Sequence, residues 1–159
     1  MKRAISIAVA LAAIVVLVVA VSASGRQSSH ARHGGQHGKG STVIEHATTD
    51  TTTDTGAAGD SVGDVLTFAN DVFDAANTKK VGTDQGYCIR VVAGSAYQCT
   101  WTTFLPGNQI IVAGPFYDAK DSTLAITGGT GRYRDARGTM ELHARAGGTE
   151  FAFVFHVTG

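Results

Sequence analysis

Three polar side chains of this sequence fall in segments that are otherwise apolar, where they could do chemistry. Glu45 directly follows two aliphatic residues, and Asn70 alternates with apolar residues over 66–72. Arg90 occurs in a third apolar segment, and an unpaired guanidinium in an apolar interior is so costly that it needs a partner or a function. Glu45 could be either this partner or a ligand contact. Glu45, Asn70 and Arg90 are therefore candidate catalytic residues. For Asn70 the alternative is that it only satisfies backbone groups.

Other residue patterns argue against a metal centre, a nucleotide or a nucleic acid. HExxH and Cys-x-x-Cys are absent, and His30, His33 and His37 are loosely spaced among glycines. Gly128–Gly131 lacks the Lys-Ser/Thr of a phosphate-binding loop and is interpreted as a turn between strands. Residues 132–137 are dense in charge and indicate a solvated loop, with an anion-attracting mouth as the alternative. The net charge is zero, so we expect no nucleic acid. The absence of these motifs also leads us to expect no metal and no cofactor.

The first part of the chain differs in composition from the rest. Two basic residues precede an uncharged run over 5–21 and a small-residue exit, the pattern of a secretory signal peptide over 1–23. The alternative is an uncleaved membrane anchor. Residues 24–41 are rich in His and Gly and predict a flexible linker. We therefore expect a secreted protein with one folded domain over 42–159.

From residue 42 onward, short apolar alternations separated by glycines predict β-strands, and no long window keeps a helical period. Evenly spaced short strands with glycine turns are typical of antiparallel barrels and sandwiches. Eight strands closed on themselves enclose room for side chains or one small ligand. We predict an all-β, eight-stranded antiparallel barrel with strands over 42–49, 63–73, 79–92, 95–105, 108–117, 122–127, 137–146 and 149–158.

The hairpin turns predict which side chains face the interior. A symmetric turn at Ala93-Gly94 places Cys88 opposite Cys99, and an even number of cysteines in an exported protein favours a disulfide. A turn at Pro106-Gly107 extends the same face to the next strand. The predicted interior face carries Cys88, Arg90, Tyr97, Cys99, Trp101, Ile110, Val112 and Phe116. The predicted outer face carries Tyr87, Ile89, Val91, Gln98, Thr100, Thr102, Ile111 and Tyr117.

The last hairpin follows the same logic. A turn at Gly147-Gly148 pairs Arg145 with Glu150, an opposite-charge pair across two strands. The alternate face is apolar and is predicted to be core, with Met140, Leu142, Ala144, Phe151, Phe153 and Phe155. Glu141, His143 and His156 then point outward, which removes them as acid–base candidates.

Several segments together resemble one known family. Residues 63–74 read GDVLTFANDVFD, residues 86–89 read GYCI, residues 112–116 read VAGPF, and residues 124–131 read LAITGGTG. These segments, with Tyr133 and Ala136-Arg137-Gly138 after them, resemble the allene oxide cyclase family, whose barrel is shared by plant dirigent proteins, over roughly residues 43–145. The resemblance implies a lipocalin-like barrel, often trimeric, whose hydrophobic cavity guides a reactive substrate into one cyclised or coupled product.

The resemblance also implies roles for single residues. Glu45 resembles a cavity glutamate that stabilises developing positive charge, and Asn70 resembles an asparagine that holds a water. Ala47 stands in place of a second asparagine, and Phe116 in place of a tyrosine. Register and resemblance together predict a ligand-binding set of Leu66, Phe68, Cys88, Tyr97, Trp101, Val112 and Phe116.

Two kinds of function are compatible with such a barrel. One is an isomerase, or a dirigent-like auxiliary, that steers cyclisation or stereoselective coupling of a small hydrophobic molecule. The other is a non-catalytic module at the cell surface that binds such a molecule or is purely structural. The apolar outer face, which includes Tyr87, Ile89 and Val91, also predicts self-association, with a trimer as the expected homo-oligomer.

Overall fold

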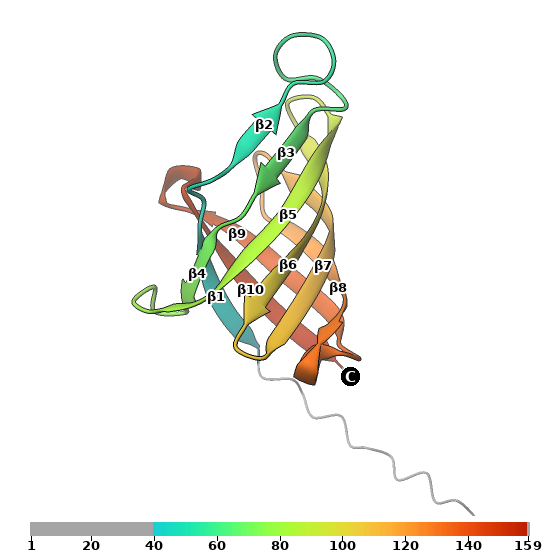
Figure 1. Ribbon diagram of the computed structural model, residues 1–159. Coiled ribbons are helices and arrows are strands. Elements are labelled where there is room, and N and C mark those ends of the chain that lie inside the picture. The colour runs from blue at the N-terminus through green and yellow to red at the C-terminus, as the bar shows by residue number, and fades with distance from the viewer. Residues whose placement is uncertain (1–39, 159) are drawn as a thin grey trace, which may run out of the picture. The chain divides into compact units, whose positions relative to one another are not determined.

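The computed structural model describes residues 40–158, which form ten β-strands and two short 3-10 turns (Figure 1). The predicted signal peptide and almost all of the predicted linker lie outside these residues. Among the described residues, no helix is long and apolar enough to cross a membrane. The elements are β1 (Ser41–His46), β2 (Thr51–Thr53), β3 (Val65–Phe68), β4 (Asp71–Asp74), β5 (Lys80–Val92), β6 (Ala96–Leu105), β7 (Asn108–Tyr117), β8 (Ser122–Thr130), η1 (Gly131–Tyr133), β9 (Arg137–Arg145), η2 (Ala146–Gly148) and β10 (Glu150–Thr158).

The strands close into an antiparallel barrel with eight strand positions. The neighbours follow the order β2-β3-β5-β4-β1-β10-β9-β8-β7-β6, and β5 also pairs with β6, which closes the sheet. β3 and β4 both pair with β5, and their other neighbours are β2 and β1, respectively. β1 and β2 therefore form one interrupted strand position, and β3 and β4 form a second. The predicted eight-stranded barrel is confirmed. The two interruptions, and with them β2 as a separate strand, were not predicted.

The interruptions meet at Asn70, which lies between β3 and β4. Its backbone exchanges two hydrogen bonds with Asp84 of β5, at 3.0 and 2.9 Å. Its side-chain oxygen accepts hydrogen bonds from the backbone amides of Thr48 at 3.0 Å and Thr49 at 2.9 Å. The chain between β1 and β2 therefore bonds to a side chain where a regular strand would bond to its neighbour, and these amides stay satisfied.

The predicted register of the hairpins is confirmed. Cys88 lies opposite Cys99, Trp101 lies opposite Val112, and Arg145 lies opposite Glu150. Cys88 and Cys99 form the predicted disulfide, with their Cα atoms 4.0 Å apart. This bond joins β5 to β6 on the interior face of the barrel.

Three details differ from the predictions. Ala144 is exposed instead of buried, because it lies at the end of β9 beyond the packed interior. The Glu150 carboxylate, predicted to pair with Arg145, accepts a hydrogen bond from Asn77 Nδ2 at 3.1 Å and lies 3.7 Å from the His46 ring nitrogen. β8 continues past the predicted end at residue 127 to Thr130, since Gly128 and Gly129 extend the strand before the turn.

One half of the barrel interior is filled by side chains. These side chains belong to one contiguous cluster of buried apolar residues, which continues to Cys88, Trp101 and Phe153 in the other half. The residues at the centre of this packed half are Ile110, Val112, Leu124, Ile126, Met140 and Phe155, each no more than 2% exposed. This packed half stabilises the barrel, so the interior of the other half does not need to be filled by side chains.

Candidate functional site

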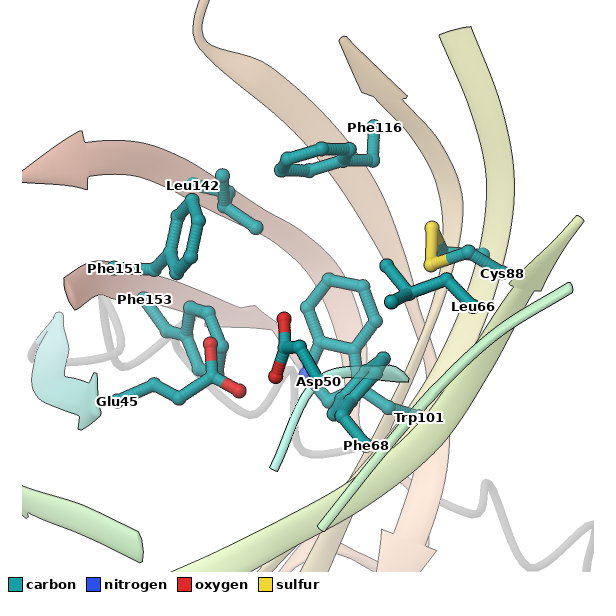
Figure 2. A pocket seen from close by; sticks show the side chains of 11 residues that line it. Glu45, Asp50, Leu66, Phe68, Cys88, Trp101, Phe116, Leu142, Phe151 and Phe153 are labelled. Carbon is teal, nitrogen blue, oxygen red and sulfur yellow. A yellow bond between two sulfur atoms is a disulfide. The ribbon is translucent and has the colours of Figure 1, made fainter. Parts of the chain in front are cut away.

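A cavity occupies the other half of the barrel (Figure 2). The space between its walls is about 360 Å³ when counted out to the open mouth. The walls are mostly aromatic and aliphatic, with two carboxyl groups among them, the usual composition of a small-molecule site. The lining residues are Glu45, Asp50, Leu66, Phe68, Cys88, Cys99, Trp101, Phe116, Leu142, Phe151 and Phe153.

Trp101 of β6 forms the central part of the aromatic wall. Its ring lies 6.0 Å from the ring of Phe68 and 5.3 Å from that of Phe153, measured between centroids. Gly86 lies directly opposite Trp101 on β5, and a Cβ atom at Gly86 would come within 2.3 Å of the Trp101 Cβ. The glycine therefore lets the tryptophan backbone approach β5 closely, and this approach sets the position of the indole ring.

Glu45 of β1 places a carboxyl group in this apolar wall. The side chain is 5% exposed, and its Oε1 accepts a hydrogen bond from Asn70 Nδ2 at 2.8 Å. The same Asn70 amide donates to Asp50 Oδ1 at 2.7 Å. Burial, with a smaller contribution from the negative charge of Asp50, raises the pKa of Glu45 to about 7, although the Asn70 hydrogen bond opposes the shift. Near neutral pH, Glu45 is therefore present both as an acid and as a base.

Asp84 of β5 is a second buried carboxyl group, behind the cavity wall. It is 1% exposed, and it is hydrogen-bonded to Glu45. Burial, together with repulsion by Glu45, raises the pKa of Asp84 to about 9. Two carboxyl groups in contact in an apolar interior do not both ionise at neutral pH. Asp84 was not among the predicted site residues, although it alternates with Cys88 on β5 and so shares the interior face.

Comparison with known proteins identifies the family. The family model described as the allene oxide cyclase barrel like domain matches residues 44–152. The chain belongs to this family. The expected membership is thus confirmed over most of the described barrel.

Solved structures share the fold of this allene oxide cyclase-like chain. One is a pyocyanin demethylase, 26% identical with a TM-score of 0.65, where the match covers 74% of this chain and 98% of that one. Another is a pterocarpan synthase dirigent protein, 19% identical with a TM-score of 0.56, covering 75% and 88%. A third is a Diels-Alderase from Streptomyces koyangensis, 17% identical with a TM-score of 0.59, covering 76% and 67%.

Most of the predicted ligand-binding residues of this allene oxide cyclase-like barrel line the cavity. Those that do are Leu66, Phe68, Cys88, Trp101 and Phe116, together with the candidate catalytic residue Glu45. Asn70 lies behind the wall, 1% exposed, and is linked to the cavity by its bonds to Glu45 and Asp50. Val112 lies in the packed half, and Tyr97 lies one layer beyond Phe116, at 6.3 Å between ring centroids. Neither Val112 nor Tyr97 lines the cavity.

Arg90 is not the partner of Glu45 that the sequence suggested. Its guanidinium pairs with Asp118 at 2.7 Å and with Asp60 at 2.6 Å, and it stacks on the Tyr97 ring at 3.6 Å. Asp60 and Asp118 lie in the loops before β3 and after β7, which meet over this end of the barrel. Arg90 therefore fastens loops at the rim and is not part of the cavity wall.

Leu142, Phe151 and Asp50 also line the cavity and were absent from the predicted ligand-binding set. Leu142 and Phe151 were predicted to face inward, so the alternation of side chains along the last hairpin could have identified them as lining residues. Asp50 belongs to the interruption between β1 and β2, where a period-two pattern carries no information.

Two other features look catalytic in the sequence alone. Residues 59–63 read GDSVG, which matches the GxSxG pattern of serine hydrolases. Ser61, however, lies in a loop between strands, and its hydroxyl donates to Asp64 Oδ1 at 3.1 Å. On the outer surface, His143 and His156 both contact Glu141, at 3.5 and 3.4 Å, and point to solvent as predicted. Within residues 40–158, no group of His, Cys, Asp and Glu side chains is arranged to hold a metal ion.

Proposed function

We propose that this barrel binds a small, largely apolar molecule and steers its cyclisation, isomerisation or coupling beside Glu45. The observation that carries the proposal is the nearly buried carboxyl group of Glu45 in a cavity wall that is otherwise mostly aromatic and aliphatic, with Asp50 as an exposed second carboxyl group. Such a cavity fixes the conformation of a flexible substrate, and orientation alone contributes strongly to the rate of an intramolecular reaction.

Glu45 supplies the chemistry in this proposal. As a carboxylate, it stabilises positive charge that develops on the substrate, and it does so strongly because the surroundings are apolar and the group is already oriented by Asn70. With a pKa near 7, it also takes a proton from one substrate atom and returns it to another. Both roles leave the composition of the substrate unchanged, as in an isomerisation or a cyclisation.

The relatives support a reaction on a small molecule in this fold without fixing which one. The structural neighbours include a dirigent protein and a Diels-Alderase at low identity, which bear on the fold alone. The pyocyanin demethylase is 26% identical over nearly its whole length. Pyocyanin is therefore a reasonable first probe of the cavity.

We further propose that the protein works outside the cytoplasm and as a homo-oligomer. The disulfide between Cys88 and Cys99 is typical of proteins from oxidising compartments. Tyr87, Ile89 and Val91 are between 41% and 49% exposed on one strand, an apolar strip that self-association would cover. Light scattering on purified protein tests the trimer, and a monomer at all concentrations would contradict it.

The decisive experiment for the function asks what the cavity holds and whether the ligand emerges changed. Apolar molecules that co-purify with the full chain are extracted and identified by mass spectrometry, and pyocyanin is added as a defined probe. Trp101 is the only tryptophan of the chain and lines the cavity, so its fluorescence reports occupancy directly. An enzyme yields a product isomer, whereas a binding module returns the ligand intact.

The matched variants are Glu45→Gln and Glu141→Gln. Glu45→Gln keeps the shape of the side chain and removes its charge, so we expect conversion to be lost while Trp101 still reports binding. Glu141→Gln makes the same chemical change on the outer face and should leave both measurements unchanged. Retained conversion in Glu45→Gln would exclude Glu45 as the catalytic group. Occupancy without conversion in the wild type would favour the non-catalytic binding module.

A further inference from the structure

The side chains of Glu45 and Asp84 lie within hydrogen-bonding distance of each other. Both are nearly buried, at 5% and 1% exposure. In the described part of the chain, no Lys, Arg or His side chain forms an ion pair with either carboxyl group, and the two basic residues of β5 pair with other aspartates: Lys80 with Asp71, and Arg90 with Asp60 and Asp118. Two adjacent carboxylates in an apolar interior would repel each other strongly, so the pair needs a proton to be stable.

The hydrogen bonds around the pair indicate which oxygen carries this proton. Asp84 Oδ1 accepts from the backbone amide of Asn70 at 3.2 Å, and Glu45 Oε1 accepts from Asn70 Nδ2 at 2.8 Å. Asp84 Oδ2 is fully buried and meets no hydrogen-bond donor among the described residues. A buried carboxyl oxygen that has no donor to accept from is satisfied when it carries a proton and is itself the donor. The Glu45 carboxyl group, which is hydrogen-bonded to Asp84, is the available acceptor.

We propose that Asp84 holds a proton on Oδ2 and donates it to Glu45, and that Asp84 is thereby the positioning residue that keeps the Glu45 carboxylate ionised and fixed toward the cavity. The catalytic meaning of this pair rests on the function proposed above, whereas the shared proton does not. Asp84 does not touch the ligand, because it lies behind the wall that Glu45 and Trp101 form.

The shared proton defines a cycle that needs no other reactant. Glu45 as a carboxylate removes a proton from the bound molecule, and both acids of the pair are then neutral. The same proton returns from Glu45 to a different atom of the molecule, which restores the ionised Glu45 with Asp84 still protonated. The substrate class is therefore an apolar molecule with an acidic C–H or O–H that rearranges by proton transfer.

Few other charges influence the pair. Asp50 faces Glu45 through the Asn70 amide and adds negative charge. His46, the next residue on β1, stacks on Phe73 and bonds to Asn77 on the outer side. Opposite Asp84 on β6 lies Thr103, which is uncharged. The protonation state is thus set mainly by Glu45, Asp84 and Asp50.

Carboxyl-selective ¹³C NMR over a pH series on the full chain without ligand tests the proposal. In the wild type, we expect the Glu45 carbon to titrate at about 7 and the Asp84 carbon at about 9. Asp84→Asn should remove the upper step and leave the Glu45 step near neutral pH, because the amide that it introduces still donates. Asp84→Val removes the donor and should raise the Glu45 step by about one pH unit or more, a tenfold change in its acid constant.

The outcomes separate the two proposals. Ordinary acidic titration of both groups in the wild type, or an upper step that persists in Asp84→Asn, would overturn the shared proton even where Asp84→Val does not fold. An unmoved Glu45 step in folded Asp84→Val would overturn the positioning role. Asp121→Asn, the same change on an exposed outer carboxylate, is the control and should leave the Glu45 step in place. Near-neutral titration without any ligand conversion would support the pair and contradict the proposed function.

Discussion

The two halves of this barrel are built from the same strands but use their interior in opposite ways. In the packed half, Ile110, Met140 and Phe155 fill the space between strands that run without interruption. In the cavity half, two of the eight strand positions are interrupted, and polar groups from Glu45, Asn70 and Asp84 replace apolar ones (Figures 1 and 2). The half with regular strand pairing and apolar packing forms the scaffold. The site lies in the half where strand pairing is interrupted and apolar packing is incomplete.

The comparison also explains how the cavity half remains ordered despite its polar interior. Asn70 replaces lost strand pairing by accepting from two backbone amides and donating to two carboxylates. The disulfide between Cys88 and Cys99 lies in the cavity wall. Specific bonds in this half therefore do what close packing does in the other half.

The largest expected difference between the halves is the effect of removing a phenylalanine ring from β10. Phe155 is 1% exposed in the packed half, so Phe155→Ala should lower the free energy of unfolding by about 3–5 kcal/mol. Phe151 is half-buried in the cavity wall of the same strand, and Phe151→Ala should cost about 1–2 kcal/mol. Urea unfolding followed by circular dichroism measures both. Equal losses would show that the cavity half is packed as tightly as the other.

The disulfide should be the next largest contribution, and it acts on the cavity half. It closes a short loop, with a sequence separation of 11 residues. Replacing both Cys88 and Cys99 by alanine should therefore cost about 3 kcal/mol by the loop-entropy relation. Thermal unfolding of the double variant, compared with oxidised wild type, measures the loss. Mass spectrometry after thiol alkylation confirms the oxidised state, and two alkylated thiols in exported wild-type protein would contradict the bond.

A pH series separates the halves by a different property, because only the cavity half buries carboxyl groups with raised pKa values. Glu45 and Asp84 titrate at about 7 and about 9 in the folded protein and lower in the unfolded chain. Between the unfolded and the folded pKa of each group, the folded state therefore binds more protons than the unfolded chain. The contribution of the two groups to the free energy of unfolding is complete at acidic pH and is lost as the pH rises through the folded pKa values.

The slope of this loss should reach about 1.4 kcal/mol per pH unit for each proton involved. The double variant Glu45→Gln/Asp84→Asn should show a much flatter profile from mildly acidic to alkaline pH. A small slope should remain from the partly exposed His143, because its hydrogen bond to Asp121 raises its pKa. The pKa values of Asp64 and Asp74 are lowered by hydrogen bonds from neighbouring backbone amides, so their contribution appears only at more acidic pH. An equally steep profile in the double variant would assign the slope to other groups.

The sequence predicted the packed half and the strand register well for a simple physical reason. Side chains alternate along a strand, and a short turn fixes which residues face each other, so Cys88 opposite Cys99 followed from spacing alone. The same alternation placed Trp101, Phe116 and Phe153 inside. The same alternation also places Asp84 inside. A single aspartate in a strand is recognised as a site residue only when its buried partner, here Glu45, is known.

The interruptions and the role of Arg90 were not predictable from local pattern. Asn70 bonds to backbone amides more than twenty positions earlier in the chain, which no periodicity reveals. The partners of Arg90, Asp60 and Asp118, come from two separate loops that the closed barrel brings together. Long-range side-chain contacts of this kind depend on the finished topology, and this is why the sequence left the partner of Arg90 open.

Arg90→Met should have an effect as small as that of Phe151→Ala, and it tests whether the rim belongs to the site. The Arg90 side chain is 9% exposed, but its partners Asp60 and Asp118 are 41% and 29% exposed. Water therefore solvates both carboxylates once the guanidinium is gone, and the methionine still packs against Tyr97. We expect a loss of about 1–2 kcal/mol in unfolding free energy, because partly exposed charge pairs contribute little more than that.

Occupancy of the cavity, read from Trp101 fluorescence with pyocyanin, should be unchanged in Arg90→Met. A loss of ligand affinity at unchanged stability would mean that Arg90 contacts the ligand from the rim and that the cavity extends past Phe116. A loss of stability several times larger would mean that the loops before β3 and after β7 contribute to the fold as much as the packed half does.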